Sequence, residues 1–359
     1  MSPVSEPGGL ILNSFKEIRL DSLHRQYPKG RRLMKRRWLY PFIFSAALIS
    51  YSVFALLDTF VIRKDVVAVS ELEAVSKIED KSSAGDSSFH FIERSTSAGS
   101  AVASTSLSSS VEASLPEVTE NTYKSDDLDI KLYEVREYDT TIYIADVLVT
   151  DLSALKSGLA EDSFGRNVSE TTSSMAERLS AILAINGDYY GFRNTGYVMR
   201  NSLLYRSTPG NSAGDLVLYS DGRMEIINES EISAEELLEK GATDIWSFGP
   251  GLVENGVITV SENDEVGRSM TSNPRTAIGM VEPGHYFFVV SDGRTNESEG
   301  LSLYQLADIM KTLGCTVAYN LDGGGSSTMY FNGRIINNPT TNKNRTNERA
   351  VSDIIYVGT

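Results

Sequence analysis

The chain has 359 residues, which is enough for one sizeable domain with extensions or for two domains. Its formal net charge is −15, and its positive charge is concentrated in residues 1–64, which hold 11 Lys and Arg against 4 Asp and Glu. The remaining residues are strongly acidic, which excludes nucleic-acid binding through a basic face and does not by itself specify a substrate.

Residues 38–62 form an apolar stretch, WLYPFIFSAALISYSVFALLDTFVI, of the length needed to cross a bilayer as a helix. Five basic residues lie within 31–37, whereas only Arg63 and Lys64 follow the stretch directly. The positive-inside rule therefore predicts residues 1–37 as a cytoplasmic tail and everything after about residue 63 as extracellular. The long N-terminal region favours an uncleaved, single-pass signal anchor in the cell membrane over a cleaved signal peptide.

Residues 63–127 are predicted as an extracellular juxtamembrane segment followed by a linker. Apolar side chains recur at near-helical spacing over residues 65–80, which indicates a short helix or a self-associating segment. Residues 82–118 are dominated by Ser, Ala, Thr and Glu, so they cannot bury a core and indicate a flexible tether.

Residues 128–359 have the composition of a folded domain. Strand-like runs occur at residues 130–136, 141–149, 182–185, 215–219, 224–227, 276–280, 286–290 and 315–319, and helical ones at 171–183 and 302–313. The second helix is predicted to begin with a capping box from Ser302 to Gln305 and to end at Gly314. Residues 228–240 are expected to form a loop. We predict a single α+β or α/β domain with a mixed β-sheet and flanking helices.

The cysteine and histidine content excludes further classes of site. Cys315 is the single cysteine, so no intrachain disulfide can form, and its apolar surroundings indicate a small buried side chain. Only one histidine, His285, lies in the predicted domain, which argues against a Ser–His–Asp hydrolase and against a multi-histidine zinc site. Acid–base chemistry must therefore come mainly from Asp, Glu or Tyr.

The segment Asn320-Leu321-Asp322-Gly323-Gly324-Gly325-Ser326-Ser327 is the most informative polar cluster. It follows an apolar strand and places one carboxylate directly before three glycines and a pair of hydroxyls. Three glycines cost backbone entropy and are tolerated where the backbone approaches a ligand closely, and their successive N–H groups suit an anion. The segment therefore indicates chemistry at Asp322 on an anionic or polar ligand.

Other polar clusters also follow or begin predicted strands, at residues 186–190, 273–275, 291–294 and 347–349. Ligand sites are built where strand ends meet at one edge of a sheet, so we expect these clusters to converge. They would bring together three aspartates and three arginines, namely Asp188, Asp292, Asp322, Arg275, Arg294 and Arg349. Arginine forks suit recognition of phosphate or carboxylate, and paired carboxylates suit cleavage of a glycosidic bond.

The domain resembles the phosphodiester glycosidase family, whose animal members are N-acetylglucosamine-1-phosphodiester α-N-acetylglucosaminidases. The resemblance is carried, in order, by residues 186–190, 247–253, 275–279, 292–294, 299–303, 320–329, 338–339 and 348–351. The Leu-Asp-Gly-Gly-Gly-Ser-Ser run at 321–327 is the most specific of these. One departure is Asp188, which stands where the family has the second glycine of an Asn-Gly-Gly turn.

The resemblance implies hydrolysis of the sugar–phosphate bond of a sugar-1-phosphodiester with a GlcNAc-like sugar. It implies catalytic carboxylates among Asp322, Asp292, Glu299 and Asp188. The residues implied in substrate and phosphate binding are Arg275, Arg294, Arg349, Asn186, Asn320, Gly323, Gly324, Gly325, Ser326 and Ser327. With its N-terminal anchor the chain is similar to a bacterial surface member, acting on a cell-surface glycan, an exopolysaccharide or a wall polymer.

Two alternatives come from other classes of protein. A surface protein that binds glycans or phosphoglycans without turnover would use the same polar clusters. A metal-dependent phosphoesterase would use the same carboxylates, and their oxygen-only ligands would suit Ca²⁺ or Mg²⁺.

Overall fold

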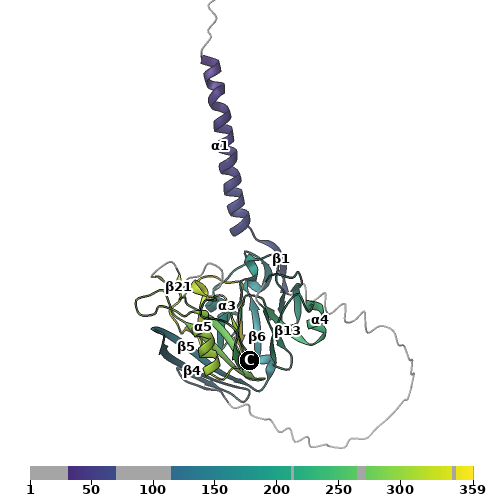
Figure 1. The fold of residues 1–359 in the computed structure, drawn as a ribbon, viewed down its shortest axis with the longest axis vertical. Coiled ribbons are helices and arrows are strands. Elements are labelled where there is room, and N and C mark those ends of the chain that lie inside the picture. Colours follow the sequence, from purple (N-terminus) through teal and green to yellow (C-terminus); the bar gives the residue numbers. More distant parts are fainter. Residues whose placement is uncertain (1–30, 70–114, 212–213, 265–271, 342–344, 359) are drawn as a thin grey trace, which may run out of the picture. The chain divides into compact units, whose positions relative to one another are not determined.

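The computed structural model describes residues 31–69, 115–211, 214–264, 272–341 and 345–358. The chain divides into two units, Met1–Leu57 and Asp58–Thr359. The N-terminal unit holds most of one long helix, α1 (Arg31–Phe60), which Figure 1 shows in purple. Its stretch Tyr40–Thr59 has a mean hydropathy of 1.8 and buries none of its side chains, so it suits a membrane span or a signal sequence. Residues 1–30 of the predicted cytoplasmic tail lie outside the described residues.

The segment after α1 forms a strand, β1 (Lys64–Ala68), which pairs antiparallel with β7 (Ser163–Arg166). The Asn167 side chain donates a hydrogen bond of 2.8 Å to the Ile62 carbonyl and holds this segment beside β7. The helix expected from residue 65 is therefore wrong for residues 65–68, because strand pairing satisfies their backbone groups instead. Residues 70–80 and most of the predicted linker lie outside the described residues.

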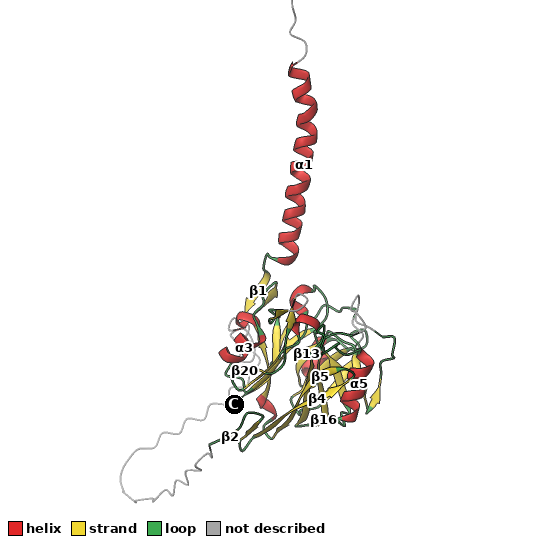
Figure 2. Cartoon of the chain, turned by 90° about the vertical axis from the view of Figure 1, so that its left-hand side faces the viewer, coloured by secondary structure: helices red, strands yellow, loops and turns green. Residues whose placement is uncertain are grey.

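Strands are the main regular structure in the described part of the second unit, and Figure 2 shows its short helices at the outside of the strands. The largest sheet has nine strands, in the order β15-β14-β18-β16-β17-β5-β4-β3-β2. Their bounds, in that order, are Val257–Ile258, Gly251–Glu254, Val317–Asn320, Thr276–Glu282, His285–Ser291, Thr140–Val149, Leu128–Glu137, Thr122–Lys124 and Glu117–Val118. The sheet thus begins at Glu117, before the residue at which we predicted the domain to start.

Two five-stranded sheets complete the framework. One consists of β10 (Leu203–Arg206), β9 (Val198–Arg200), β13 (Ala242–Trp246), β11 (Asp215–Tyr219) and β12 (Met224–Ile227). The other consists of β20 (Arg334–Ile335), β19 (Met329–Phe331), β8 (Leu183–Asn186), β23 (Asp353–Val357) and β6 (Leu155–Leu159), and β21 (Thr340–Thr341) pairs with β22 (Arg345–Thr346). Among the described residues every strand pair in these sheets is antiparallel, so the sheet-dominated fold is confirmed, with several antiparallel sheets in place of one mixed sheet.

Among the described residues three short helices flank these sheets: α3 (Thr172–Arg178), α4 (Ala234–Glu239) and α5 (Leu303–Thr312). The predicted capping box of α5 is confirmed, because Ser302 and Gln305 each bind the other's backbone N–H. Helix α4 lies where a loop was expected and has its own capping box, from Ser233 to Glu236. The 3₁₀ turns are η1 (Leu152–Ala154), η2 (Ala160–Asp162), η3 (Tyr190–Phe192) and η4 (Gly324–Ser326).

Buried side chains from all three large sheets form the main hydrophobic core, which includes Ile130, Phe288, Trp246 and Ile355. A second cluster packs Leu306 of α5 against the nine-stranded sheet. These two hydrophobic clusters pack against the strands and fix the positions of the strand ends. The loops at those ends carry the candidate site.

We expect Leu306→Ala to lower the free energy of unfolding by about 2–5 kcal/mol, because Leu306 is fully buried and its loss leaves a cavity. Lys311→Ala, at an exposed position of the same helix, should cost less than about 1 kcal/mol. Urea denaturation followed by the fluorescence of buried Trp246 measures both variants. Equal effects of the two substitutions would contradict the packing assigned to α5.

Candidate active site

The glycine-rich turn that follows β18 is held against the end of β8. The Asp322 backbone N–H donates to the Gly187 carbonyl at 3.1 Å, and the Asn186 side chain donates to the Asp322 carbonyl at 2.6 Å. The Asn186 side-chain oxygen accepts hydrogen bonds from the Thr276 hydroxyl and the Thr328 N–H. Asn186 is fully buried, so its role in the structure is to fix the Asp322 backbone.

The Asp322 carboxylate lies next to a cation at the mouth of this turn. Its Oδ2 accepts hydrogen bonds from the Ser326 hydroxyl at 2.6 Å and from Arg349 Nη2 at 2.9 Å. Arg349 Nε also donates to the Ser326 hydroxyl oxygen at 2.8 Å, which closes a three-residue arrangement. Burial raises the pKa of Asp322, and the contacts from Arg349 and Ser326 act in the opposite direction.

A second guanidinium group, that of Arg294, packs against the same turn. Gly324 has φ of +64°, and a Cβ at this position would lie 2.8 Å from Arg294 Nη2, so the close approach requires glycine. Arg294 is oriented by Asn273, whose side-chain oxygen accepts from Nε at 3.1 Å and from Nη2 at 2.8 Å. Burial and the neighbouring Arg349 lower the pKa of Arg294, while Asp322 raises it. The turn therefore faces two positive groups.

A cavity of about 230 Å³ opens beside the Asp322 carboxylate. Its lining consists of Asp188, Tyr189, Phe192, Asp322, Arg349, Ala350, Val351 and Ser352. The rings of Tyr189 and Phe192 stack at 4.7 Å between centroids with an interplanar angle of 20°. The cavity thus combines apolar ring surfaces with a carboxylate and a guanidinium group, which is the composition of a small-ligand site.

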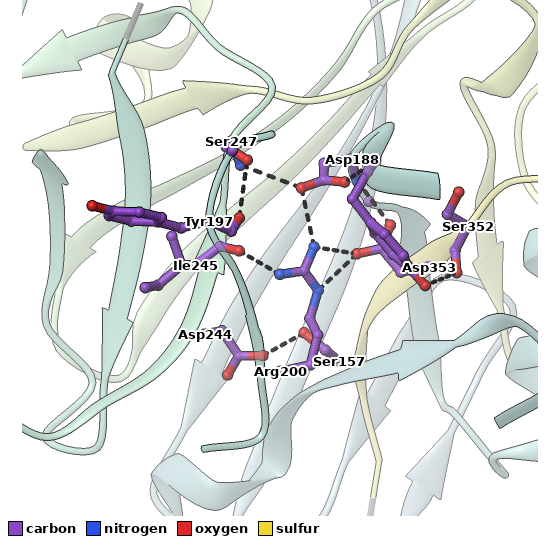
Figure 3. A network of polar contacts seen from close by, with 12 residues as sticks. Ser157, Asp188, Tyr197, Arg200, Asp244, Ile245, Ser247, Ser352 and Asp353 are labelled. Carbon is purple, nitrogen blue, oxygen red and sulfur yellow. Dashed lines mark hydrogen bonds and ion pairs between the residues drawn. The ribbon is translucent and has the colours of Figure 1, made fainter. Parts of the chain in front are cut away.

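The wall behind this cavity is a buried ionic network, shown in Figure 3. Arg200 lies between two carboxylates, with Nη2 at 3.1 Å from Asp188 Oδ2 and at 2.6 Å from Asp353 Oδ2. The remaining acceptor capacity of Asp188 is filled by backbone N–H groups of Tyr190, at 2.6 Å, and Ser247, at 3.2 Å. Since these side chains are at most 1% exposed, the network fixes the turn that carries Tyr189.

The carboxyl group of Asp353 in this network has a raised pKa. Burial raises its pKa to about 7, and the like charge of Asp188 adds to the rise, while Arg200 opposes it. The pKa of Arg200 is raised above its ordinary value, because the nearby carboxylates outweigh its desolvation. The raised pKa of Arg200 favours its charged form, whereas the raised pKa of Asp353 favours its neutral form. Both follow from the fact that two carboxylates share one guanidinium group.

The structure does not bring all the predicted site residues to this cavity. Asp292 is bound instead by Asn338, through N–H at 2.8 Å and the amide nitrogen at 2.9 Å, and by the Tyr143 hydroxyl at 3.3 Å. Glu299 is exposed, and its backbone carbonyl accepts from the Arg294 N–H. Neither lines the cavity, and Asp292 is held by Asn338 instead.

Arg275 and Asn320 are also buried away from the cavity. Arg275 Nε donates to the Leu301 carbonyl at 2.9 Å, and the Asn320 amide nitrogen donates to the Gly249 carbonyl at 2.8 Å. Both residues lie outside the lining of the cavity and support the loops around it.

Four residues of the site went unrecognised in the sequence: Tyr189, Phe192, Arg200 and Asp353. Tyr189 stood in a cluster already singled out, and a run of aromatics directly after a polar strand end was the available signal. Arg200 and Asp353 lie within strand-like sequence, where no local pattern distinguishes an ion pair from a polar edge.

The side chains at the cavity do not fit a metal centre. Among the described residues no three His, Cys, Asp or Glu side chains group together as metal ligands. The two cavity carboxylates, Asp188 and Asp322, each contact a guanidinium group that already supplies positive charge.

The Asp353 pKa predicts a pH dependence of stability. In the unfolded chain an aspartate titrates near pH 3.9, so between about pH 4 and 7 the folded state binds more protons. The contribution of Asp353 to the free energy of unfolding should therefore fall as the pH rises through this window and stay constant above it.

Asp353→Asn should remove the pH-dependent contribution of Asp353 to the free energy of unfolding. The difference in the free energy of unfolding between wild type and variant, measured by urea denaturation, should therefore shrink as the pH rises from about 4 to 7. Ser352→Ala, which leaves the carboxylates in place, serves as the control. A difference that grows with rising pH would contradict the assignment.

Comparison with known proteins places this region among named families. A family model described as phosphodiester glycosidase matches residues 180–358. A prophage-derived protein of Bacillus subtilis, YomE, is 32% identical over 201 residues, which is 54% of this chain and 30% of YomE. The N-acetylglucosamine-1-phosphodiester α-N-acetylglucosaminidase of mouse is 27% identical over 175 residues, covering 44% of this chain and 33% of the mouse protein. The chain thus spans about a third of the length of these relatives.

Solved structures share the fold. The catalytic domain of the zebrafish N-acetylglucosamine-1-phosphodiester α-N-acetylglucosaminidase, auto-inhibited by its pro-peptide, aligns with a TM-score of 0.53 at 20% identity, over 65% of this chain and 83% of that one. A hypothetical protein from Synechocystis aligns with a TM-score of 0.52 at 15% identity, over 68% of this chain and 64% of that one.

Proposed function

Because residues 180–358 belong to the phosphodiester glycosidase family, we propose that the protein hydrolyses the bond between a sugar C1 and the phosphate oxygen of a sugar-1-phosphodiester. The observation that carries this proposal is the arrangement of Asp322, Ser326 and Arg349 at the mouth of an aromatic-lined cavity. The printed activity of the mouse relative favours a GlcNAc-like sugar.

In this proposal the phosphate binds at the glycine-rich turn. Arg349 and Arg294 flank that turn and would neutralise the charge that grows on the phosphate oxygen as the C1–O bond breaks. The phosphate monoester that departs is already a good leaving group, so electrostatic stabilisation of this kind can replace most of the help of a general acid.

The sugar ring would lie against the stacked rings of Tyr189 and Phe192. The C–H face of a pyranose packs on aromatic rings, and this contact would place C1 toward the Asp322 carboxylate. A cavity of about 230 Å³ lies below the usual range for drug-sized ligands, which favours one sugar residue over an oligosaccharide.

Asp322 would act on the C1 side of the scissile bond. Its carboxylate can take a proton from an attacking water or stabilise the positive charge at C1, while the electron pair of the C1–O bond leaves with the phosphate. Arg349 favours the charged form of Asp322 against the effect of burial, as either role requires. Asp188 is engaged by Arg200 and backbone N–H groups, so we assign it to the wall of the cavity.

We extend the proposal to location. Helix α1 would anchor the chain in the cell membrane as a single-pass signal anchor, with the catalytic domain outside the cell. The substrate would then be a sugar phosphodiester in a surface glycan, an exopolysaccharide or a wall polymer.

The test uses the full chain in detergent with methylphospho-GlcNAc, measuring release of GlcNAc. Asp322→Asn should lower kcat at least about a thousandfold, since it removes the carboxylate that acts at C1. Asp308→Asn is the matched control, because Asp308 lies on α5, outside the cavity, and accepts a hydrogen bond from the Tyr138 hydroxyl. Full activity in Asp322→Asn would refute the assigned role, and binding of the substrate without turnover by wild type would support a glycan-binding protein instead.

We expect Tyr189→Ala to raise KM more than it lowers kcat, because stacking on the ring acts on bound substrate and transition state alike. Tyr133→Ala, an exposed tyrosine of β4, is the control. A loss in kcat with unchanged KM would contradict the placement of the sugar.

Incubation with EDTA should leave the rate of GlcNAc release unchanged, since the cavity carboxylates are paired with guanidinium groups. Loss of activity that returns on adding Ca²⁺ or Mg²⁺ would favour the metal-dependent phosphoesterase.

A further inference from the structure

A second cavity, of about 420 Å³, lies on the other side of the turn that lines the candidate active site. The residues of the turn alternate between the two: Tyr189 and Phe192 line the first cavity, whereas Tyr190 and Arg193 line the second. Because adjacent residues of one turn line the two cavities, the cavities are neighbours.

Three arginines line this second cavity: Arg166, Arg193 and Arg206. A single carboxylate, that of Asp65 on β1, also lines it, so the lining carries a positive excess. Within the described residues no ion pair joins Asp65 to any of the three arginines. Among the described residues, then, no salt bridge neutralises the three guanidinium groups.

Two buried nitrogen atoms of these arginines have no hydrogen-bond partner in the described part of the chain, Arg166 Nε and Arg206 Nη2. The other nitrogens of Arg206 are used, since Nε donates to the Gly196 carbonyl at 2.7 Å and Nη1 to the Arg193 carbonyl at 2.8 Å. Burial lowers the pKa of Arg206, the negative charge of Asp188 opposes this, and the neighbouring Arg200 and Arg193 lower the pKa further. Buried donors without partners are costly in a protein interior and are satisfied by a ligand that accepts hydrogen bonds.

Three stacked aromatic rings also line this cavity. Phe164 stacks on Tyr190 at 5.3 Å and on Tyr205 at 5.1 Å between ring centroids. Arginines and stacked rings in one cavity suit a sugar that carries a phosphate, and the first cavity has the same composition.

We propose that this second cavity binds a further phosphate group of the same substrate, so that the enzyme acts on a chain carrying phosphodiesters at successive sugars rather than on an isolated sugar phosphodiester. The inference rests on the proposed function, and it adds a substrate class to it. Asp65 opposes the bound anion and limits its affinity.

The first arm of the test measures binding of inorganic pyrophosphate to the full chain in detergent by calorimetry. Arg166→Gln should weaken binding roughly tenfold or more, since it removes a charge-assisted donor. Asp65→Asn should strengthen binding, because it removes the opposing charge. Arg223→Gln is the control, because its guanidinium group pairs with Glu225 away from this cavity.

The second arm compares kcat/KM for methylphospho-GlcNAc with kcat/KM for its dimer, which carries two phosphodiesters. Arg166→Gln should lower the value for the dimer roughly tenfold or more and leave that for the single unit unchanged. Arg166 lies on β7, outside the first cavity, so a general loss of folding would lower both values together.

The outcomes separate the two proposals. Turnover of both substrates with no dependence on Arg166 would overturn the second phosphate site and leave the glycosidase standing. Absence of turnover on either substrate would overturn the glycosidase, and equal pyrophosphate affinity of wild type and Arg166→Gln would then overturn the phosphate site as well. Pyrophosphate binding that depends on Arg166, without any effect on the dimer, would overturn the assignment to the substrate.

Discussion

The contact on which the candidate site depends is the buried guanidinium group of Arg200 between Asp188 and Asp353. Arg200 ends β9 in one five-stranded sheet, and Asp353 begins β23 in the other, so this pair joins the two sheets. A buried ion that loses its partner is strongly destabilising, so the three side chains hold one arrangement. That arrangement fixes the 188–192 turn, which lines one cavity with Tyr189 and the other with Tyr190.

The same network accounts for a departure from the family pattern. Asp188 stands where the resemblance noted in the sequence leads one to expect a second glycine, and in this chain its carboxylate is a counter-ion to Arg200 and an acceptor for two backbone N–H groups. The preceding Gly187 remains necessary, because a Cβ there would lie 2.4 Å from Asp353 Oδ1. The added charge is thus absorbed by the wall and leaves Asp322, with Arg349 beside it, as the carboxylate available for chemistry.

Helices and strands could be predicted where the local sequence pattern favours the same secondary structure as the packing around it. Strands β11 and β12 have the bounds read from the sequence, because turn residues separate apolar runs there, and α5 has the capping box that its sequence spells out. For β1 the sequence indicated a short helix or a self-associating segment, and the helix is wrong for residues 65–68, since the pairing of β1 with β7 joins residues about a hundred positions apart. Asp322 and Arg349 were both predicted as site residues. The contact between them and the separation of Asp292 from the cavity depend on how the loops pack, which no local sequence pattern indicates.

The measurement that tests the central claim most directly is hydrolysis of methylphospho-GlcNAc in water enriched in ¹⁸O, followed by mass spectrometry of both products. An active site in which Asp322 acts at the sugar and the arginines hold the leaving phosphate breaks the C1–O bond. The label should then appear in the C1 hydroxyl of the released sugar and not in methyl phosphate. Label in the phosphate product would mean attack at phosphorus, which contradicts a glycosidase mechanism for this cavity.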